Sequence, residues 1–285
     1  MRFAFIRRYA GEFPVAWMCQ VLDVSLSGYY AWLRRPESQR SRDDRRLLIE
    51  IRAIHRQSRR TYGSPRIYRE LRERQYRCGR HRVARLMCQD GLEGTYRRKF
   101  RVTTNSKHRW PVAPNRLGRH FEVATPNTVW AGDITYIWTR EGWLYLAVLL
   151  DLCSRRVVGW ATSSRLTRRL PQAALEMAIG RRRPAAAVLH HSDRGSQYAS
   201  KDYRKALVEA GFIVSMSRRG DCYDNAPLES FFATLKKELV AGEVFFSRAQ
   251  ARREIVDYIE GFYNCWRRHS SLGYLSPVAY EEKVA

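Results

Sequence analysis

The order of strand-like and helix-like segments after Phe121 constrains the fold of this chain more than any other feature of the sequence. Three segments rich in β-branched and aromatic residues follow one another, joined by short turns, at 128–139, 143–153 and 155–163. Helices are then expected at 170–182, 201–211 and 225–240, alternating with strands at 186–193 and 212–218. Hairpin strands followed by alternating strands and helices predict a mixed sheet with helices on both faces.

The predicted fold class is therefore α/β, with a mixed five-stranded sheet. The order βββ-α-β-α-β-α is the ribonuclease H-like arrangement, which retroviral integrase cores share. In such a sheet the first and fourth strands are expected to be neighbours.

Three acidic residues occupy unusual positions on these elements. Asp133 lies inside an apolar and aromatic strand, where a charge is costly unless it is paired or bound to a metal. Asp193 follows the fourth strand, and Glu229 lies in the last helix. Neighbouring first and fourth strands would bring Asp133 and Asp193 to one edge of the sheet, and Glu229 would close the site from a flanking helix.

Three carboxylates at such a site would repel one another, and one would stay protonated unless cations neutralise them. Mg²⁺ prefers an all-oxygen setting of this kind. Two such ions about 4 Å apart activate a nucleophile and stabilise a leaving oxygen at phosphorus, which predicts a phosphodiester substrate. Asp151 and Asp224 are rival acids, for which a turn at a strand end and a helix cap are the alternative roles.

The charge of the chain favours a polyanionic partner. Its 52 Lys and Arg against 28 Asp and Glu give a formal net charge of +24. Residues 1–119 carry 29 of the basic and only 10 of the acidic side chains. Nucleic acid is the commonest partner of such a surface, although some basic proteins have no polyanionic partner. The longest apolar run, 144–150, is far below the ~20 residues that span a bilayer, so no membrane association is expected.

Helical patterns in the basic part predict DNA-binding modules. Residues 12–34 read as two short helices around a turn. Three helices follow, and the last of them buries an apolar face while its polar side chains suit a major groove; a solvated arginine-rich face is the alternative. These candidate DNA-binding side chains are Arg80, Arg82, Arg85 and Gln89.

The expected domain organisation follows from these changes of pattern. The domains are a helix-turn-helix segment at 1–40, a basic trihelical DNA-binding domain at 41–98, a basic linker at 99–119, a catalytic core at 120–242 and a helical extension at 243–285.

Several stretches resemble the transposases of the bacterial insertion-sequence-three family, and the likeness covers nearly the whole chain. In the catalytic part they are WAGDITYI with GWLYLAVLLDLCSRRVVGW, then HHSDRGSQY, GDCYDNAPLESFFATLKKE and YIEGFYNCWRRHSSLGYLSP. In the basic part FPVAWMCQVLDVSLSGYYAWL and YGSPRIYREL resemble the second-reading-frame product of the same family.

This resemblance implies that Asp133, Asp193 and Glu229 form a metal-binding DDE triad with two Mg²⁺ ions, for which Mn²⁺ would substitute. It implies nicking of element ends by water and attack of the freed 3′-hydroxyl on target DNA. The implied partners are the terminal inverted repeats, target DNA, further copies of the chain on DNA and an upstream-frame fusion or partner. The implied location is the bacterial cytoplasm, at the nucleoid.

Residues near the triad have supporting roles in this interpretation. Asn225 would hold Glu229 or a metal-bound water, or else cap the helix, and Lys236 would hold a terminal DNA phosphate or remain a solvated lysine. Gly195, Ser196 and Gln197 would let the chain approach the scissile strand. Two other functions stay open from the sequence: a non-catalytic DNA-binding regulator, and a structure-selective nuclease of the same fold.

Overall fold

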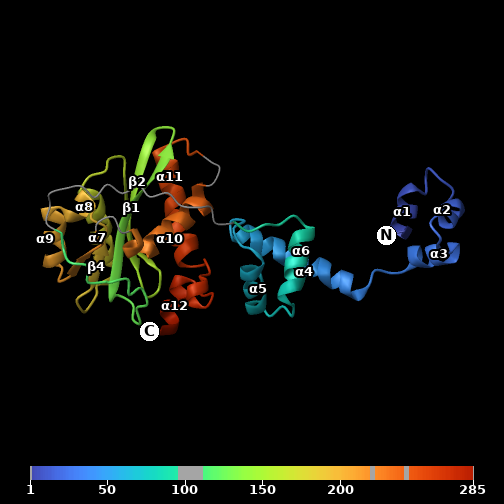
Figure 1. The fold of residues 1–285 in the computed structure, drawn as a ribbon, viewed down its shortest axis with the longest axis horizontal. Coiled ribbons are helices and arrows are strands. Elements are labelled where there is room, and N and C mark those ends of the chain that lie inside the picture. The colour runs from blue at the N-terminus through green and yellow to red at the C-terminus, as the bar shows by residue number, and fades with distance from the viewer. Residues whose placement is uncertain (1, 96–111, 219–221, 241–243, 285) are drawn as a thin grey trace. The chain divides into compact units, whose positions relative to one another are not determined.

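The structure is a computed structural model that describes residues 2–95, 112–218, 222–240 and 244–284 (Figure 1). Its contacts divide the chain into two compact units, Met1–Ala53 and Ile54–Ala285. Most of the basic linker predicted at 99–119 lies outside the described residues.

The first unit contains three short helices, α1 (Arg2–Tyr9), α2 (Val15–Val21) and α3 (Leu26–Arg34). The two helices expected around a turn are present as α2 and α3. Ser25 caps α3, because its hydroxyl accepts a hydrogen bond from the amide of Gly28 at 3.0 Å. The sequence pattern did not predict α1, which completes the small apolar core through the buried side chain of Ile6.

A three-helix segment follows, made of α4 (Gln39–Gln57), α5 (Ser64–Glu73) and α6 (Arg80–Gln89). The α4 helix begins earlier than its apolar pattern indicates, since the hydroxyl of Ser38 accepts from the amide of Ser41 at 3.2 Å and so satisfies a free amide at the helix start.

The sheet contains five strands in the order β3-β2-β1-β4-β5. Their bounds are β1 (Val129–Thr139), β2 (Gly142–Asp151), β3 (Val157–Ser163), β4 (Leu189–Ser192) and β5 (Ile213–Met216). The first three pair antiparallel, and β4 and β5 continue the sheet in parallel from β1. The predicted mixed five-stranded α/β core is confirmed, including the pairing of the first strand with the fourth.

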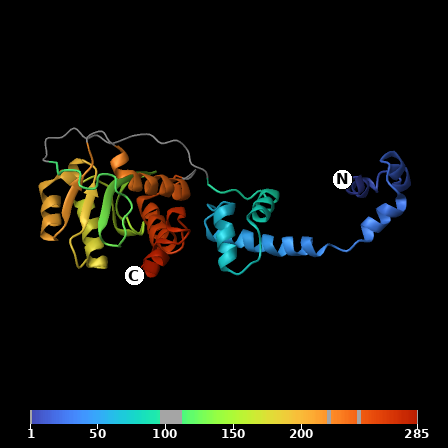
Figure 2. The same cartoon turned by 60° about the horizontal axis from the view of Figure 1, so that its bottom comes forward.

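Helices cover both faces of this sheet (Figures 1 and 2). On one face, α7 (Arg169–Arg182) and α9 (Lys201–Glu209) enclose a core that includes Trp130, Leu149 and Tyr203. On the other face lie α10 (Ala226–Leu235) and α11 (Arg248–Val256). The short helix α8 (Ser196–Ala199) connects β4 to α9.

Two of the C-terminal helices change their winding part-way. The α10 helix continues as the π-helical turn η2 (Lys236–Val240), and α11 continues as the π-helix η3 (Asp257–Asn264). The chain ends with the 3-10 turn η4 (Ser270–Leu272) and α12 (Pro277–Val284). Within the predicted helical extension at 243–285, the helical run from Arg248 to Asn264 therefore has two forms.

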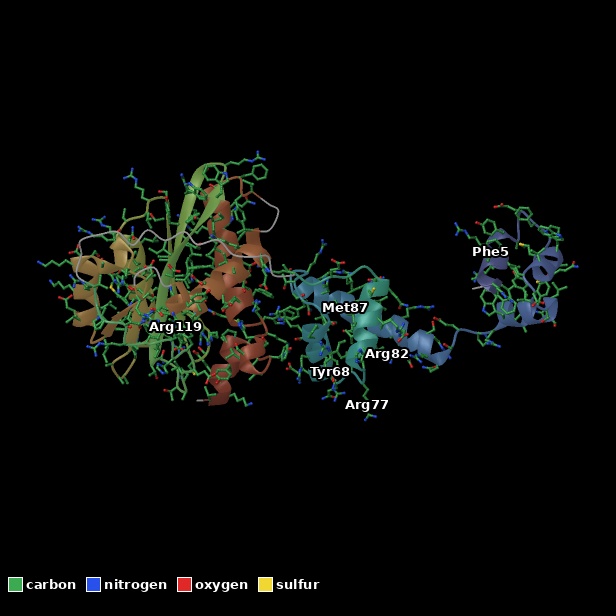
Figure 3. All side chains as sticks on the ribbon, viewed as in Figure 1. Phe5, Tyr68, Arg77, Arg82, Met87 and Arg119 are labelled. Carbon is green, nitrogen blue, oxygen red and sulfur yellow. The ribbon has the colours of Figure 1, made fainter. Side chains whose placement is uncertain are left out.

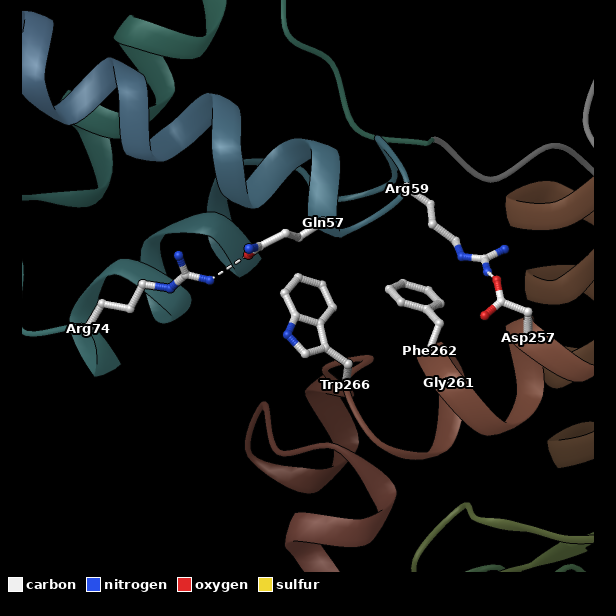
Figure 4. Close-up of a pocket in the computed structure, with 7 residues that line it drawn as sticks. All are labelled: Gln57, Arg59, Arg74, Asp257, Gly261, Phe262 and Trp266. Carbon is white, nitrogen blue, oxygen red and sulfur yellow. Dashed lines mark hydrogen bonds and ion pairs between the residues drawn. The ribbon is translucent and has the colours of Figure 1, made fainter.

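The tail is tied to the three-helix segment by aromatic and ionic contacts. Tyr62 and Trp266 stack with ring centroids 5.1 Å apart. The guanidinium of Arg268 donates to Glu70 and Glu73, both at 2.6 Å. Beside this contact lies a pocket of about 470 Å³ (Figure 4), lined by Gln57, Arg59, Arg74, Asp257, Gly261, Phe262 and Trp266.

None of the helices in the described residues has the length and apolar character that a bilayer-crossing segment needs. The cysteines of the described part that can be assessed are free thiols: Cys19, Cys78, Cys88, Cys153 and Cys265.

Candidate active site

The end of strand pairing between β1 and β4 positions the two aspartates. The last register pair of these parallel strands is Gly132 with Ser192. Asp133 and Asp193 are the residues directly after this pair, so both carboxylates lie where the pairing of β1 with β4 ends. A side chain on Gly132 would come within 3.2 Å of the His190 ring, which explains why glycine precedes Asp133.

The electrostatics bring Glu229 into the same site. The pKa of Asp133 is raised well above its ordinary value, first by burial and then by the negative charges of Asp193 and Glu229. The amide of Ile134 opposes this shift by donating to the Asp133 carboxylate at 2.7 Å. Burial also raises the pKa of Glu229. Asp133 therefore senses the charges of both other acids that the sequence singled out.

Two buried histidines support the end of β4 that carries Asp193. His191 lies 2.9 Å from the hydroxyl of Ser215 and 3.2 Å from that of Ser217 on the neighbouring chain segment. His190 lies 2.9 Å from the hydroxyl of Tyr203. Burial lowers the pKa of His190 to about 3 and that of His191 to about 4, so both are neutral at pH 7.

The turn after Asp193 holds this carboxylate in place. The amide of Gly195 donates to Asp193 Oδ1 at 2.8 Å. A Cβ at Gly195 would meet Asp193 Oδ1 at 2.9 Å, so a larger residue would push the carboxylate away. Ser196 is exposed and Gln197 half-buried, which places both at the rim of the turn rather than in the core.

Asn225 has a buried amide without a hydrogen-bond partner among the described residues. Only 5% of the residue is exposed, and neither its side-chain nitrogen nor its oxygen is satisfied. It occupies the N-cap position of α10, but its side chain makes no capping bond. The helix-capping alternative for Asn225 is therefore not realised. An unsatisfied buried amide one turn before Glu229 points to a missing ligand or water.

The rival acids have structural roles. Asp151 accepts from the amides of Asn127 and Cys153, at 2.6 and 2.9 Å, as expected for a residue that starts a turn. Asp224 was predicted to cap the last helix, which is wrong. Instead its carboxylate accepts hydrogen bonds from Arg218 and Arg119. The hydrogen bonds from Arg218 are the main cause of the lowered pKa of Asp224. The chain between 112 and 120 is thereby held on the core.

Lys236 lies beside the acids. Its ammonium is 4.8 Å from the ring centroid of Tyr136, and its pKa is lowered by burial while the charge of Asp133 opposes that shift. Sequence reasoning missed Tyr136, because residues three positions apart in a strand point to opposite faces and no local pattern links Tyr136 to Asp133.

The predicted groove-binding side chains lie on α6, whose opposite face is buried. Arg80, Arg85 and Gln89 are exposed, and Arg82 is half-buried. Arg82 is labelled in Figure 3. Arg85 donates to Gln89 at 3.1 Å, so these two side chains are held together on the surface.

The donor chemistry of the acids fits a hard divalent cation. Burial, and then the charges of Asp193 and Glu229, raise the pKa of Asp133, and a bound cation would oppose this shift. Within the described ranges, however, no three His, Cys, Asp or Glu side chains are close enough to share a metal ion. Cation binding would have to draw the three carboxylates closer together.

Comparison with known proteins places the chain in a family. The HTH-like domain family matches residues 41–100, and the Integrase core domain family matches residues 124–222 and 229–284. The transposase InsF for insertion sequence IS3A of Escherichia coli (strain K12) is 44% identical over 285 residues, which cover 99% of both chains. This chain belongs to the IS3 family of transposases.

A second relative agrees with this assignment. A 31 kDa protein of the insertion element IS600 of Shigella sonnei is 49% identical over 266 residues. The match covers 93% of this chain and 98% of that protein. Among solved structures, the simian T-cell lymphotropic virus intasome chain has a TM-score of 0.44 and 16% identity, covering 77% of this chain and 70% of its own. The HTLV-2 integrase catalytic core with magnesium has a TM-score of 0.41 and 16% identity, covering 55% of this chain and 97% of its own.

Proposed function

We propose that this IS3-family transposase nicks the ends of its insertion element and joins the freed 3′-hydroxyl to target DNA at the site formed by Asp133, Asp193 and Glu229. The proposal is supported by two observations: the pairing of β1 with β4 ends directly before Asp133 and Asp193, and the charges of Asp193 and Glu229 both act on Asp133. The site chemistry is therefore that of a polynucleotidyl transferase.

The three carboxylates would hold two Mg²⁺ ions, for which Mn²⁺ would substitute. These ions would supply Lewis-acid chemistry toward phosphate oxygens. The side chains around the triad do the positioning. Asn225 would bond Glu229 or a water through its free amide, and Lys236 would bind the terminal phosphate. Gly195, Ser196 and Gln197 would let the scissile strand approach Asp193.

The rest of the chain would bind and hold DNA. Arg80, Arg82, Arg85 and Gln89 would read the terminal inverted repeats, and the predicted linker at 99–119 would follow phosphates. In this scheme 1–40 and 41–98 are DNA-binding domains, 120–242 is the catalytic core and 243–285 its extension. Two element ends and one target imply a homo-oligomer on DNA, with or without an upstream-frame partner, at the nucleoid in the cytoplasm.

The decisive experiment measures nicking and joining on DNA that carries the flanking repeats of the source locus. Glu229→Gln should lower both rates by more than the ~10–100-fold that loss of an outer-shell partner causes. DNA binding should be retained, because the amide keeps the size of the side chain. Glu209→Gln is the matched control: Glu209 is an exposed helical glutamate that pairs only with Lys205 in the salt bridges described, and its loss should change neither rate.

Unchanged activity of Glu229→Gln with retained binding would remove Glu229 from the site. A regulator without catalysis would bind the repeats with and without metal and cut neither. A structure-selective nuclease would cut, but would fail to join a pre-cut end to a target.

A further inference from the structure

An exposed aromatic surface lies on the hairpin of β1 and β2, beginning three residues beyond Asp133 on the same strand. We define the hairpin aromatics as Tyr136, Trp138 and Trp143, whose exposed fractions are 38%, 48% and 42%. Trp143 contacts Tyr136 edge-on, with ring centroids 5.0 Å apart, and Trp138 in the same way at 4.7 Å. The three rings thus form one continuous cluster, and large exposed aromatic clusters commonly mark binding sites.

The fold itself does not require aromatic residues at these positions. Ile137 and Thr139, which alternate with them along β1, are buried and supply the packing of this strand. The pairing of β1 with β4 ends at Gly132, so the hairpin extends beyond the parallel part of the sheet (Figure 1). Tyr136 and Trp138 therefore keep part of their ring surface exposed to solvent.

The hairpin aromatics reach the candidate active site through Lys236. Lys236 directly follows α10, the helix that carries Glu229, and its ammonium lies 4.8 Å from the Tyr136 ring centroid. The far end of the cluster also carries cations. Arg140 at the hairpin tip lies over the ring of Phe246 at 4.3 Å, and Arg248 donates to the carbonyl oxygen of Trp143 at 3.1 Å.

Open aromatic faces bordered by cations fit the bases and phosphates of a nucleic-acid strand. A duplex offers few free base faces, because its bases already stack on one another, whereas an unpaired strand offers all of them. Tyr136 and Trp138 follow Asp133 on β1, so a DNA strand bound to these rings would continue toward the acids. We propose that the hairpin aromatics bind unpaired nucleotides of the DNA strand that flanks the scissile phosphate, by stacking bases on Tyr136, Trp138 and Trp143.

This inference deepens the proposed function and takes its DNA substrate from it. A binding experiment with the full chain in EDTA tests it without catalysis. Two probes are compared: a blunt duplex, and the same duplex with a short thymine extension on one strand. Wild-type protein should bind the extended duplex more tightly. In the double variant Trp138→Leu and Trp143→Leu, affinity for the extended duplex should fall ~10-fold or more, with little change for the blunt one.

The conservative double variant Trp138→Phe and Trp143→Phe is the matched control, since it keeps aromatic faces and should retain most of the preference. A second readout on wild-type protein uses 2-aminopurine in the extension, whose fluorescence should be quenched on binding as the base stacks. Equal affinity of wild-type protein for both probes, unquenched 2-aminopurine, or an unchanged preference in the leucine variant would overturn the proposal.

Two outcomes separate this inference from the proposed function. Protein that joins element ends but shows no preference for the extension would overturn the stacking surface alone. Protein that stacks the extension but neither nicks nor joins would overturn the catalytic proposal alone. Self-association that the leucine substitutions abolish, without any effect on DNA, would assign the hairpin aromatics to a contact between copies of the chain.

Discussion

Asp133 carries a charge that the protein fold alone makes unfavourable. Its carboxylate is held against a sheet edge with two further acids, and its pKa is raised by burial and by their charges. The folded protein consequently takes up a proton more readily than the unfolded chain does. Between the ordinary aspartate pKa and this raised value, the free energy of unfolding must decrease as pH rises.

We therefore expect Asp133→Asn to stabilise the metal-free protein at pH 7, because the amide removes the buried charge. A stabilisation of 1 kcal/mol would raise the melting temperature by about 2–4 °C in a protein of this size. The gain should shrink as pH falls below the raised pKa, where wild-type Asp133 is protonated. Thermal unfolding in EDTA over a pH series measures this effect.

The same melts with Mg²⁺ supply the control. Mg²⁺ should stabilise wild-type protein through mass action and should stabilise Asp133→Asn less. A variant that melts below wild type in EDTA at pH 7 would contradict the repulsion between the three acids.

At the scale of elements, close packing of β3 on α7 fixes the sheet against its covering helix. Gly159 of β3 has no side chain, and a Cβ there would lie 2.2 Å from the carbonyl oxygen of Ala174 and 2.7 Å from Ala178. The helix backbone can approach this strand only because the residue is glycine.

Gly159→Ala should therefore destabilise the protein by ~1–3 kcal/mol or more, since strand and helix must separate. Gly180→Ala is the matched control, because Gly180 lies in α7 with no atom within 4 Å of a built Cβ. It should stabilise the helix by up to ~1 kcal/mol. Denaturant unfolding measures both, and equal effects of the two substitutions would show that the contact at Gly159 does not limit the packing.

At the scale of the whole molecule, Arg268 links the C-terminal tail to the three-helix segment. Arg268 is only 8% exposed, and its guanidinium donates hydrogen bonds to Glu70 and Glu73 of α5. Glu70 is buried to the same extent. Loss of Arg268 leaves the buried Glu70 carboxylate with only the longer contact from Arg74, at 3.4 Å.

Arg268→Met should therefore lower the free energy of unfolding by ~3–5 kcal/mol. The double variant with Glu70→Gln should lose less than the sum of the single effects, because no unpaired carboxylate remains. Lys205→Met provides the control, since Lys205 and Glu209 form an exposed pair worth ~1 kcal/mol at most. Equal effects of Arg268→Met and Lys205→Met in denaturant unfolding would refute the link.

Local patterns in the sequence were sufficient to predict the order of the strands and helices of the core. Strands follow from runs such as WAGDITYI, and helices from apolar residues at helical spacing, because both signals depend only on near neighbours in the chain. The three acids could be picked out for the same reason: each stands at a position where its own element makes a charge unusual. Their roles as metal ligands stay a prediction.

Other features depend on contacts that no local pattern encodes. The bonds of Asp224 with Arg119 and of Arg268 with Glu70 join residues far apart in the chain, so helix capping was the nearer but wrong explanation for Asp224. The sequence does not distinguish the buried tyrosines of the tail from the exposed Trp138 and Trp143, because all of them are aromatic residues within regular elements.

The sequence by itself determined which segments become strands and helices, the basic character of the N-terminal part and the acids that stand out on their elements. Only the tertiary structure decided which side chains are covered, which charges meet, and that the buried amide of Asn225 has no hydrogen-bond partner among the described residues. The physical reason is that burial and electrostatic energy depend on distances in space, whereas hydrophobic periodicity depends on distances along the chain.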